Sequence, residues 1–205
     1  MSTIMLNVPQ ILQNPELPNG CEITSCTEIL NYLGFPADKC EMADIYLPRS
    51  ENWYGTEPDI FYMGNPHIDD SSEECGYYCF AGPIVAAANK YIASHGGGYR
   101  AVDITGANEK MLRGQLKEGR PFIYWASLHF EDILYDDEHS FTLPDGREHR
   151  LFHHLHCMVC RGMDSDMYYI ADPLDFNTAV PREQFMKIYR QLGSRAVVIV
   201  PEKAS

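Results

Sequence analysis

The 205-residue sequence contains no apolar run of membrane-spanning length, and no basic and then apolar segment of the kind that directs secretion opens it. We therefore expect no membrane partner. As it stands, the sequence indicates a cytoplasmic protein, although a secreted chain whose signal peptide had been trimmed would look the same.

Positive charge is scarce in this chain. It has 16 Lys and Arg against 29 Asp and Glu, a formal net charge of −13, and its basic residues form no run. Because nucleic acids bind basic patches, we expect no nucleic-acid partner. Internal repeats and low-complexity linkers are also missing from the sequence, and its length suits one domain, so we predict a single domain over residues 1–205.

The seven cysteines are odd in number, which argues against a disulfide framework and for reduced thiols. The spacings "CGYYC" (75–79) and "CMVC" (157–160), together with His153, His154 and His156, raise the alternative of a zinc site. However, "HCMVC" reads as a strand that sends residues 157 and 160 to opposite faces, whereas a chelating pair needs a turn. We therefore favour buried structural thiols, and expect neither a metal nor an organic cofactor.

Apolar spacing predicts helices in the first part of the chain and strands in the second. Helices are expected after Gly20, from Cys40 to Tyr46, from Pro83, and over residues 107–118 and 181–191. Strands are expected at "FIYWASL", "HCMVCRG", "MYYIAD" and "AVVIVP". This order predicts an α+β fold with an antiparallel sheet.

The stretch "PELPNGCEITSC" places two cysteines around the start of the first expected helix. Cys21 follows the Pro-Asn-Gly turn and lies in the first helical turn, where free backbone amides and the helix dipole favour a thiolate. Cys26 falls on the apolar stripe and is expected in the core. Cys21 is therefore the candidate nucleophile if the fold supplies a base, and we expect alkylating agents to modify it ahead of the other six cysteines.

A histidine on an expected hairpin is the candidate base. "HCMVCRG" runs up, "MDSD" turns and "MYYIAD" returns. With the turn centred on Asp164, His156 directly faces Asp172, close enough for the carboxylate to orient the imidazole. A two-residue slip would keep the faces but lose this pair, and His156 as an ordinary packed strand residue is the simpler alternative.

Attack on a carbonyl also needs hydrogen-bond donors for the oxyanion. Gln13 lies eight residues before Cys21, and the Pro-bounded loop between them would let its carboxamide fold back toward the thiol. Taken alone, Gln13 is an ordinary surface glutamine. Its significance comes from the order Gln, Cys, His, Asp along the chain.

Four segments together resemble a known family: "VPQILQNPELPNGCEITS", "GYYCFAGPIVAAANKY", "LKEGRPFIYWAS" and "HCMVCRGMDSDMYYIADP". They are similar to the papain-like cysteine peptidases, specifically to standalone members of the bacteriocin-processing, double-glycine-cleaving branch, peptidase family thirty-nine. The resemblance spans nearly the whole chain. It implies a papain-like fold in which an N-terminal helical side carries the Cys and a C-terminal antiparallel sheet carries the His and Asp.

Matched position by position, the resemblance implies Cys21 as the nucleophile, His156 as the base, Asp172 as its orienting acid and Gln13 as the oxyanion-hole amide. His156 is preferred to the two histidines just before it because only His156 stands six residues before Gly162. One departure is Arg161, where the family usually has an apolar residue, and it puts the local packing in question.

The implied activity is hydrolysis of peptide or related amide bonds through a thioester acyl-enzyme, with a peptide or protein as substrate. Two alternatives stay open. One is an acyl or peptidyl transferase that uses the same thioester, and the other is a catalytically degenerate papain-like binding protein. Retention of all four catalytic residue types argues against the second alternative.

Two long polar segments, residues 48–80 and 129–150, have no expected catalytic role. They combine aromatic residues with the acidic clusters "DDSSEE" and "YDDEH". If both border the cleft of a papain-like fold, the site favours basic or neutral peptides over acidic ones. If they are solvated loops, their charge serves only solubility.

Overall fold

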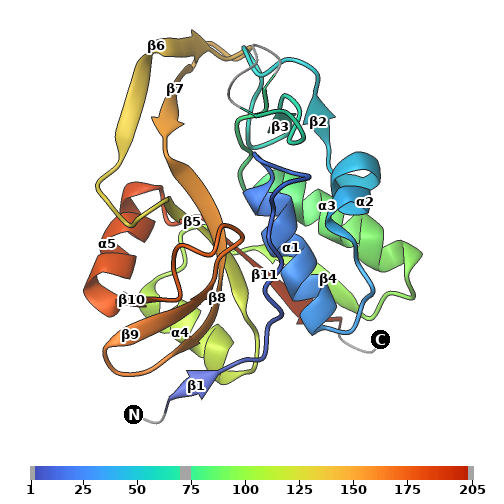
Figure 1. Cartoon of the computed structure of the whole chain (residues 1–205), viewed down its shortest axis with the longest axis vertical. Helices are drawn as coiled ribbons and strands as arrows, with labels where there is room; N and C mark the ends of the chain where they lie inside the picture. Colours follow the sequence, from blue (N-terminus) through green and yellow to red (C-terminus); the bar gives the residue numbers. More distant parts are fainter. Residues whose placement is uncertain (1–2, 70–74, 203–205) are drawn as a thin grey trace.

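Helices and a twisted sheet meet along the length of the molecule, and a smaller hairpin projects at one end (Figure 1). A computed structural model describes residues 3–69 and 75–202. The helices are α1 (Cys21–Tyr32), α2 (Lys39–Glu41), the π-helix η1 (Met42–Tyr46), α3 (Ala81–Ser94), α4 (Glu109–Lys117) and α5 (Arg182–Gln191). Each matches a predicted helix, except that a short α-helix and a π-helix share the segment predicted as one helix from Cys40 to Tyr46.

The main sheet has seven strands, in the order β10-β9-β8-β5-β11-β4, with β1 paired to β8. Its strands are β1 (Ile4–Met5), β4 (Tyr99–Asp103), β5 (Phe122–Ser127), β8 (Leu155–Met163), β9 (Met167–Ala171), β10 (Ala179–Pro181) and β11 (Ala196–Pro201). The described pairings within this sheet are all antiparallel, which confirms the prediction. The strands β1, β4 and β10 were not predicted, because none of them contains an apolar run or an alternation clear enough to be recognised.

The first helix is central because it runs through the interior. Residues 21–30 are all buried, and α1 packs against β8, β5 and α3. Gly34 follows the helix at φ +91°, a conformation that favours glycine, and turns the chain away. The packing of α1 on β8 and β5 holds the start of the helix against the middle of the sheet.

The segment before α1 is held extended against the sheet. β1 pairs with the end of β8, where a Cβ on Gly162 would overlap the carbonyl oxygen of Ile4. Further along, the Ile11 amide donates to Glu28 Oε1 at 2.8 Å, and the Gln13 amide donates to the Pro173 carbonyl at 2.9 Å. These contacts bring Gln13 to the start of α1.

The two long polar segments differ from each other. Residues 48–80 remain mostly irregular, with one short parallel pair, β2 (Arg49–Ser50) with β3 (Tyr62–Met63). Residues 129–150 do not form an irregular loop, because most of them belong to an antiparallel hairpin of β6 (Leu134–Thr142) and β7 (Glu148–His153). The sequence hides this hairpin because β6 is exposed along most of its length and lacks an apolar face.

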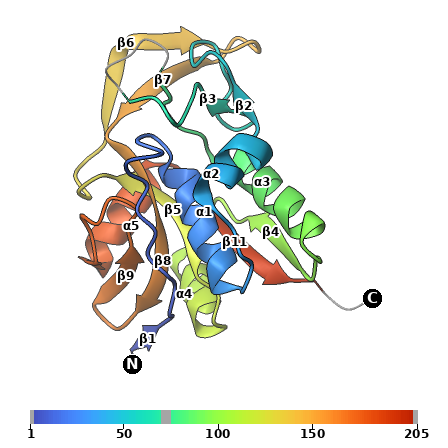
Figure 2. The same ribbon diagram turned by 45° about the vertical axis from the view of Figure 1, so that its right-hand side comes forward.

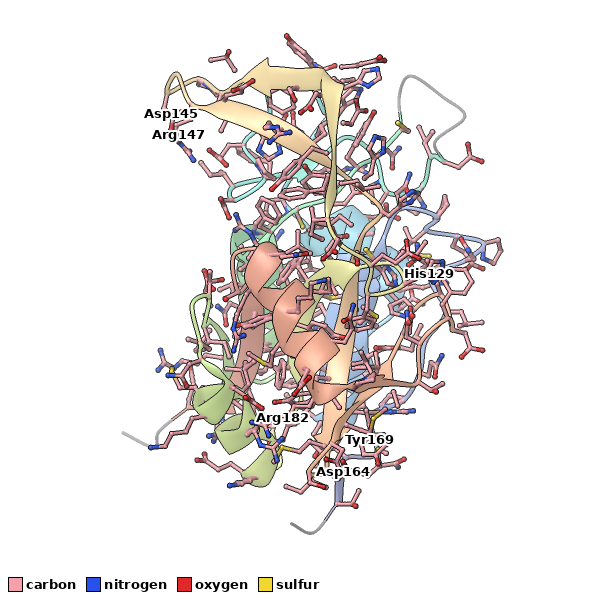
Figure 3. The ribbon with its side chains drawn as sticks, turned by 90° about the vertical axis from the view of Figure 1, so that its left-hand side faces the viewer. His129, Asp145, Arg147, Asp164, Tyr169 and Arg182 are labelled. Atoms are coloured by element: carbon pink, nitrogen blue, oxygen red, sulfur yellow. The ribbon has the colours of Figure 1, made fainter. Side chains whose placement is uncertain are left out.

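The hairpin stands at the far end of the molecule from the β8–β9 turn. Figure 3 places Asp145 and Arg147 at its tip, and Asp164 and Tyr169 at the opposite end. Seen from a second direction, β6 and β7 lie beside the loops around β2 and β3 (Figure 2). Aromatic rings join the two parts, with Trp53 and Tyr54 both packed against Phe141.

Among the helices of the described residues, none combines the length and the apolar character needed to span a membrane.

Candidate active site

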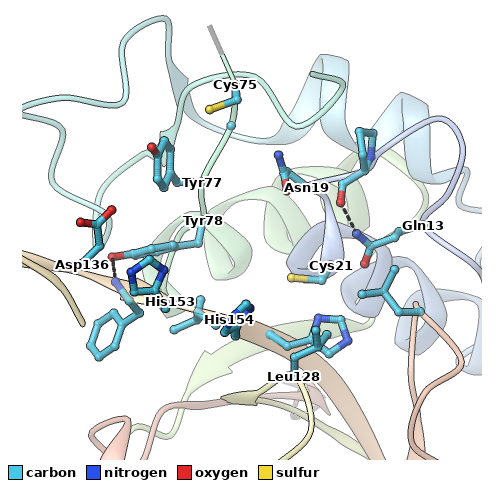
Figure 4. Close-up of a pocket in the computed structure, with 16 residues that line it drawn as sticks. Gln13, Asn19, Cys21, Cys75, Tyr77, Tyr78, Leu128, Asp136, His153 and His154 are labelled. Atoms are coloured by element: carbon cyan, nitrogen blue, oxygen red, sulfur yellow. Dashed lines mark hydrogen bonds between the residues drawn. The ribbon is translucent and has the colours of Figure 1, made fainter. Parts of the chain in front are cut away.

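A cleft of about 430 Å³ opens where the start of α1 faces the junction of β7 and β8 (Figure 4). Gln13, Cys21 and His156 line it together. The other lining residues are Pro18, Asn19, Cys75, Gly76, Tyr77, Tyr78, Leu128, Asp136, Phe152, His153, His154, Leu155 and Leu174. Three of the four residues predicted from the sequence therefore meet in one cleft, and the fourth, Asp172, lies directly behind His156.

Cys21 is the first residue of α1, as predicted, and its side chain is almost fully buried. Its sulfur lies 3.4 Å from Glu22 Oε2 and, in Figure 4, points away from Gln13. Burial, and next the charge of Glu22, raise the pKa of the Cys21 thiol well above its ordinary value. In this arrangement burial and the neighbouring carboxylate therefore favour the protonated thiol, whereas the helix start alone predicts a thiolate.

His156 and Asp172 form a buried pair. His156 Nε2 lies 2.6 Å from Asp172 Oδ1, and the carboxylate also accepts the Leu174 amide at 2.8 Å. Its second oxygen accepts the backbone amide of Asn177 at 3.0 Å and the side-chain amide at 2.6 Å. Burial alone would raise the pKa of Asp172, but the hydrogen bond and charge of His156 hold it below its ordinary value. Because Nε2 is engaged by Asp172, His156 Nδ1 is the ring nitrogen that can accept a proton from a group in the cleft.

The register that led to this pair was wrong. Val159 pairs with Ala171, two residues away from the assumed register, and a bulge at Arg161 shifts the pairing again. A two-residue slip keeps the same faces. The pair survives because β9 ends at Ala171 and Asp172 turns back toward His156, so the contact does not depend on direct cross-strand pairing.

The two neighbouring histidines do not share this arrangement. His153 and His154 also line the cleft, but both are exposed at the junction of β7 and β8. His154 has φ +54°, an uncommon conformation for a residue with a side chain, and its carbonyl accepts the Leu128 amide at 2.8 Å. The imidazole hydrogen-bonded to Asp172 is that of His156.

Gln13 is buried beside Cys21. Its Nε2 donates to the Pro18 carbonyl at 2.5 Å, shown as a dashed line in Figure 4, and its second Nε2 hydrogen remains for another acceptor. Lys39 Nζ holds the same stretch of backbone, donating to the Leu12 and Gln13 carbonyls at 2.5 and 2.9 Å. These hydrogen bonds hold the Gln13 side chain in the cleft that Cys21 also lines.

Two further buried carboxyls flank the site and were missed from the sequence. Burial raises the pKa of Glu22 to about 7 and that of Glu28 to about 8. Arg161, the departure from the family pattern, partly offsets the shift at Glu28. An acidic residue early in a helix is ordinary, so no sequence pattern distinguishes Glu22. Asn177, which supports Asp172, was missed for a similar reason, since Asn is common in loops.

Both long polar segments contribute to the cleft walls. Tyr77 and Tyr78 come from the first segment, and Asp136 comes from β6. The Tyr78 hydroxyl lies 2.9 Å from His149 Nε2, and Trp53 packs behind Tyr77 with ring centroids 4.8 Å apart. Of the cluster "DDSSEE", residues 70–74 lie outside the described residues. Among the described residues that line the cleft, Asp136 is the one with a carboxylate.

All seven cysteines carry free thiols. Six are buried and Cys40 is half-buried, so that Cys40 competes with Cys21 for alkylating agents. Over the described ranges, 3–69 and 75–202, no three His, Cys, Asp or Glu side chains gather in a way that could hold a metal ion.

The chain is similar to known proteins over most of its length. The model of the peptidase C39-like family matches residues 5–197. An uncharacterized Bacillus subtilis protein, YvpB, is 28% identical over 190 residues, covering 90% of this chain and 70% of that protein. A C39-like protein from Bacillus anthracis, named as a candidate peptidase, is 29% identical in its crystal structure, with both chains fully covered and a TM-score of 0.84. A double-glycine-motif protease from an AMS/PCAT transporter, crystallised with a leader peptide, is 16% identical, covering 97% of this chain and 94% of that one, with a TM-score of 0.48.

The α+β, papain-like cysteine peptidase fold predicted from the sequence is confirmed. A match to a peptidase family supports, in general terms, a cysteine peptidase function. Because the family model covers nearly the whole length, the chain belongs to the peptidase C39-like family.

Proposed function

We propose that this chain is a cysteine peptidase that hydrolyses peptide bonds through a thioester on Cys21. His156 acts as the base, Asp172 orients it, and Gln13 is an oxyanion donor. The observation that carries the proposal is the buried 2.6 Å pair of His156 and Asp172, which presents an imidazole to the cleft that Cys21 also lines.

The reaction begins with a rotation of the Cys21 side chain about its Cα–Cβ bond. The thiol leaves Glu22 and meets His156 Nδ1, because Nε2 is already engaged by Asp172. His156 takes the thiol proton, and the sulfur attacks the carbonyl carbon of the substrate. The negative charge then moves to the carbonyl oxygen, which accepts hydrogen bonds from the Cys21 backbone amide and Gln13 Nε2.

Three proton transfers complete the cycle. Protonated His156 gives its proton to the leaving amine, and the acyl group remains on Cys21 as a thioester. A water molecule, deprotonated by His156, attacks the thioester carbonyl. The C–S bond breaks, the acid is released, and His156 returns the proton to the Cys21 sulfur. This chemistry requires neither a metal nor an organic cofactor.

A peptide or protein is the substrate class that suits this cleft. It is open, and it offers polar groups from both walls, including the Asn19 side chain and the Tyr77 hydroxyl. An extended peptide exposes alternating donors and acceptors that such walls can satisfy.

A peptide-library assay read by mass spectrometry tests the proposal. The wild-type chain should cleave a subset of peptides, and Cys21→Ala should abolish that cleavage. Cys40→Ser, which removes the most exposed thiol, should leave it unchanged. Cleavage that persists in Cys21→Ala would refute the proposed nucleophile.

A further inference from the structure

The buried carboxyl of Glu22 transfers no proton in the mechanism above, yet it contacts the Cys21 thiol. Its Oε2 atom lies 3.4 Å from Cys21 Sγ. Its Oε1 atom accepts the Cys79 amide at 3.1 Å, and its side chain is fully buried. Glu22 therefore links the start of α1 to the segment that forms one wall of the cleft.

The side chains around Glu22 are acidic or neutral on each element packed there. They are Cys21 on α1, Cys79 and Tyr78 in the segment before α3, Tyr62 on β3 and Cys157 on β8, with Asp172 acting on Cys21 from beyond β9. Two basic side chains contact or act on Tyr78. Arg195 is paired with Asp59 at 2.8 Å and lies over the Phe80 ring, and His149 on β7 lies 2.9 Å from the Tyr78 hydroxyl.

These surroundings decide what the hydrogen bond does. A thiol that keeps its proton can donate to Glu22, whereas a thiolate in the same place would face a carboxylate in a buried setting. The contact consequently stabilises the protonated thiol. Since burial raises the pKa of Glu22 to about 7, its charge appears within the neutral pH range.

We propose that Glu22 is a positioning residue that holds the Cys21 thiol in a protonated resting position, from which the thiol is released when it turns toward His156. The inference rests on the proposed role of Cys21 as nucleophile. No bond forms or breaks in the resting position, and the proton stays on sulfur until His156 accepts it.

Glu22→Gln tests this role because it keeps the shape of the side chain and an oxygen for the Cys79 amide. The carboxylate oxygen beside Sγ becomes a neutral amide group, which favours the thiolate. In a Cys40→Ser background, we would measure the rate of Cys21 alkylation by iodoacetamide from pH 5.5 to 9.5, using peptide mapping. Glu22→Gln should displace the rising limb of the pH profile toward lower pH by about one unit or more, and so raise the rate at pH 7 by about tenfold.

Glu28→Gln is the matched control. Glu28 is an equally buried carboxyl on the same helix, but its hydrogen bond goes to the Ile11 amide. Its profile should superimpose on that of the parent. Superimposed profiles for Glu22→Gln and the parent, or equal displacements in both variants, would overturn the inference.

The parent chain provides a second test that needs no folded Glu22 variant. Ionisation of Glu22 near pH 7 opposes ionisation of the thiol. The logarithm of the alkylation rate should therefore rise with pH less steeply around neutrality than it would for a thiol that titrates alone. A profile that fits a single ionisation would overturn the inference. Alkylation does not depend on peptide cleavage, so a shifted Glu22→Gln profile in a chain that cleaves no library peptide would keep this inference and reject the proposed function.

Discussion

His156 Nε2 and Asp172 Oδ1 lie 2.6 Å apart in the interior, although the two residues are not directly opposed in the sheet. β9 ends at Ala171, and Asp172, the next residue, reaches His156 on β8. Asn177 then holds the far oxygen of the carboxylate through two hydrogen bonds. The orientation of the imidazole is thus set by a short loop as well as by the strand that carries it.

Weakening this loop should slow the chemical step. Asp172→Asn should lower kcat by about 10²–10⁴-fold, because the imidazole loses the carboxylate that selects its tautomer. Asn177→Ala should lower kcat by about 10–100-fold, because it removes one of two donors to the far oxygen. Steady-state kinetics on a cleaved library peptide would measure both, with little change expected in KM.

Asp175→Asn is the control for this loop. Asp175 lies close in sequence, but its carboxylate is exposed and accepts Gln10 Nε2 at 2.8 Å. It should retain nearly full activity. A loss equal to that of Asp172→Asn would mean that general disturbance of the loop, and not orientation of His156, is being measured.

Gln13 should act on the transition state more than on substrate binding. Gln13→Ala should lower kcat by about 10²–10³-fold, since an oxyanion donor is needed only when charge develops. Leu12→Ala serves as the control and should retain nearly full activity, because Leu12 precedes Gln13 and its side chain is exposed and outside the cleft lining. An effect of Gln13→Ala confined to KM would remove Gln13 from the oxyanion hole.

The charge preference expected for the cleft now rests on Asp136. Asp136→Asn should lower kcat/KM for a Lys-rich peptide by roughly two- to fivefold and spare a neutral peptide, most clearly at low salt. Asp137→Asn is the matched control, because Asp137 is the next residue and pairs with Arg150 outside the cleft lining. If both peptides respond equally to Asp136→Asn, the polar segments contribute no charge selection.

Glu28 should make the stability of the chain depend on pH. Its pKa of about 8 in the folded chain lies above the ordinary value of 4.5, so the carboxyl favours folding while it is protonated. This contribution is complete below about pH 4.5 and is lost as the pH rises toward 8, at up to about 1.4 kcal/mol per pH unit. Glu28→Gln should therefore reduce the fall in unfolding free energy between pH 5 and 8.

Urea unfolding at several pH values would measure this effect. Glu183→Gln, at an exposed position of α5, is the control and should follow the parent curve. Parallel curves for Glu28→Gln and the parent would show that Glu28 does not carry the dependence. Because burial also raises the pKa of Glu22, part of the slope should remain in Glu28→Gln.

The sequence was sufficient to predict the helices and strands that show a clear apolar spacing and are bounded by turn residues such as glycine and proline. The apolar spacing from Ile23 to Leu30 and the glycine at 34 defined α1, and the cysteine after the turn was placed at its first residue. The strands β5, β8, β9 and β11 were found because they are apolar and bounded by turn residues. The prediction of one domain over residues 1–205 remains a prediction.

Features that depend on tertiary contacts were not accessible in this way. The bulge at Arg161 and the fold-back of Asp172 come from packing of the strand ends, so the correct pair was predicted from a wrong register. The β6–β7 hairpin has no apolar face to reveal it. The state of the Cys21 thiol depends on burial and on Glu22, and neither is visible as a pattern.

Covalent labelling by a peptidyl acyloxymethyl ketone tests the central claim most directly, because this reagent needs an activated thiol within a peptide-binding cleft. Peptide mapping of the labelled chain should place the adduct on Cys21. His156→Ala should nearly abolish the labelling, while His153→Ala should leave it close to the wild-type rate. Labelling of Cys40 or Cys75 in place of Cys21, or labelling of Cys21 at an unchanged rate in His156→Ala, would contradict the account.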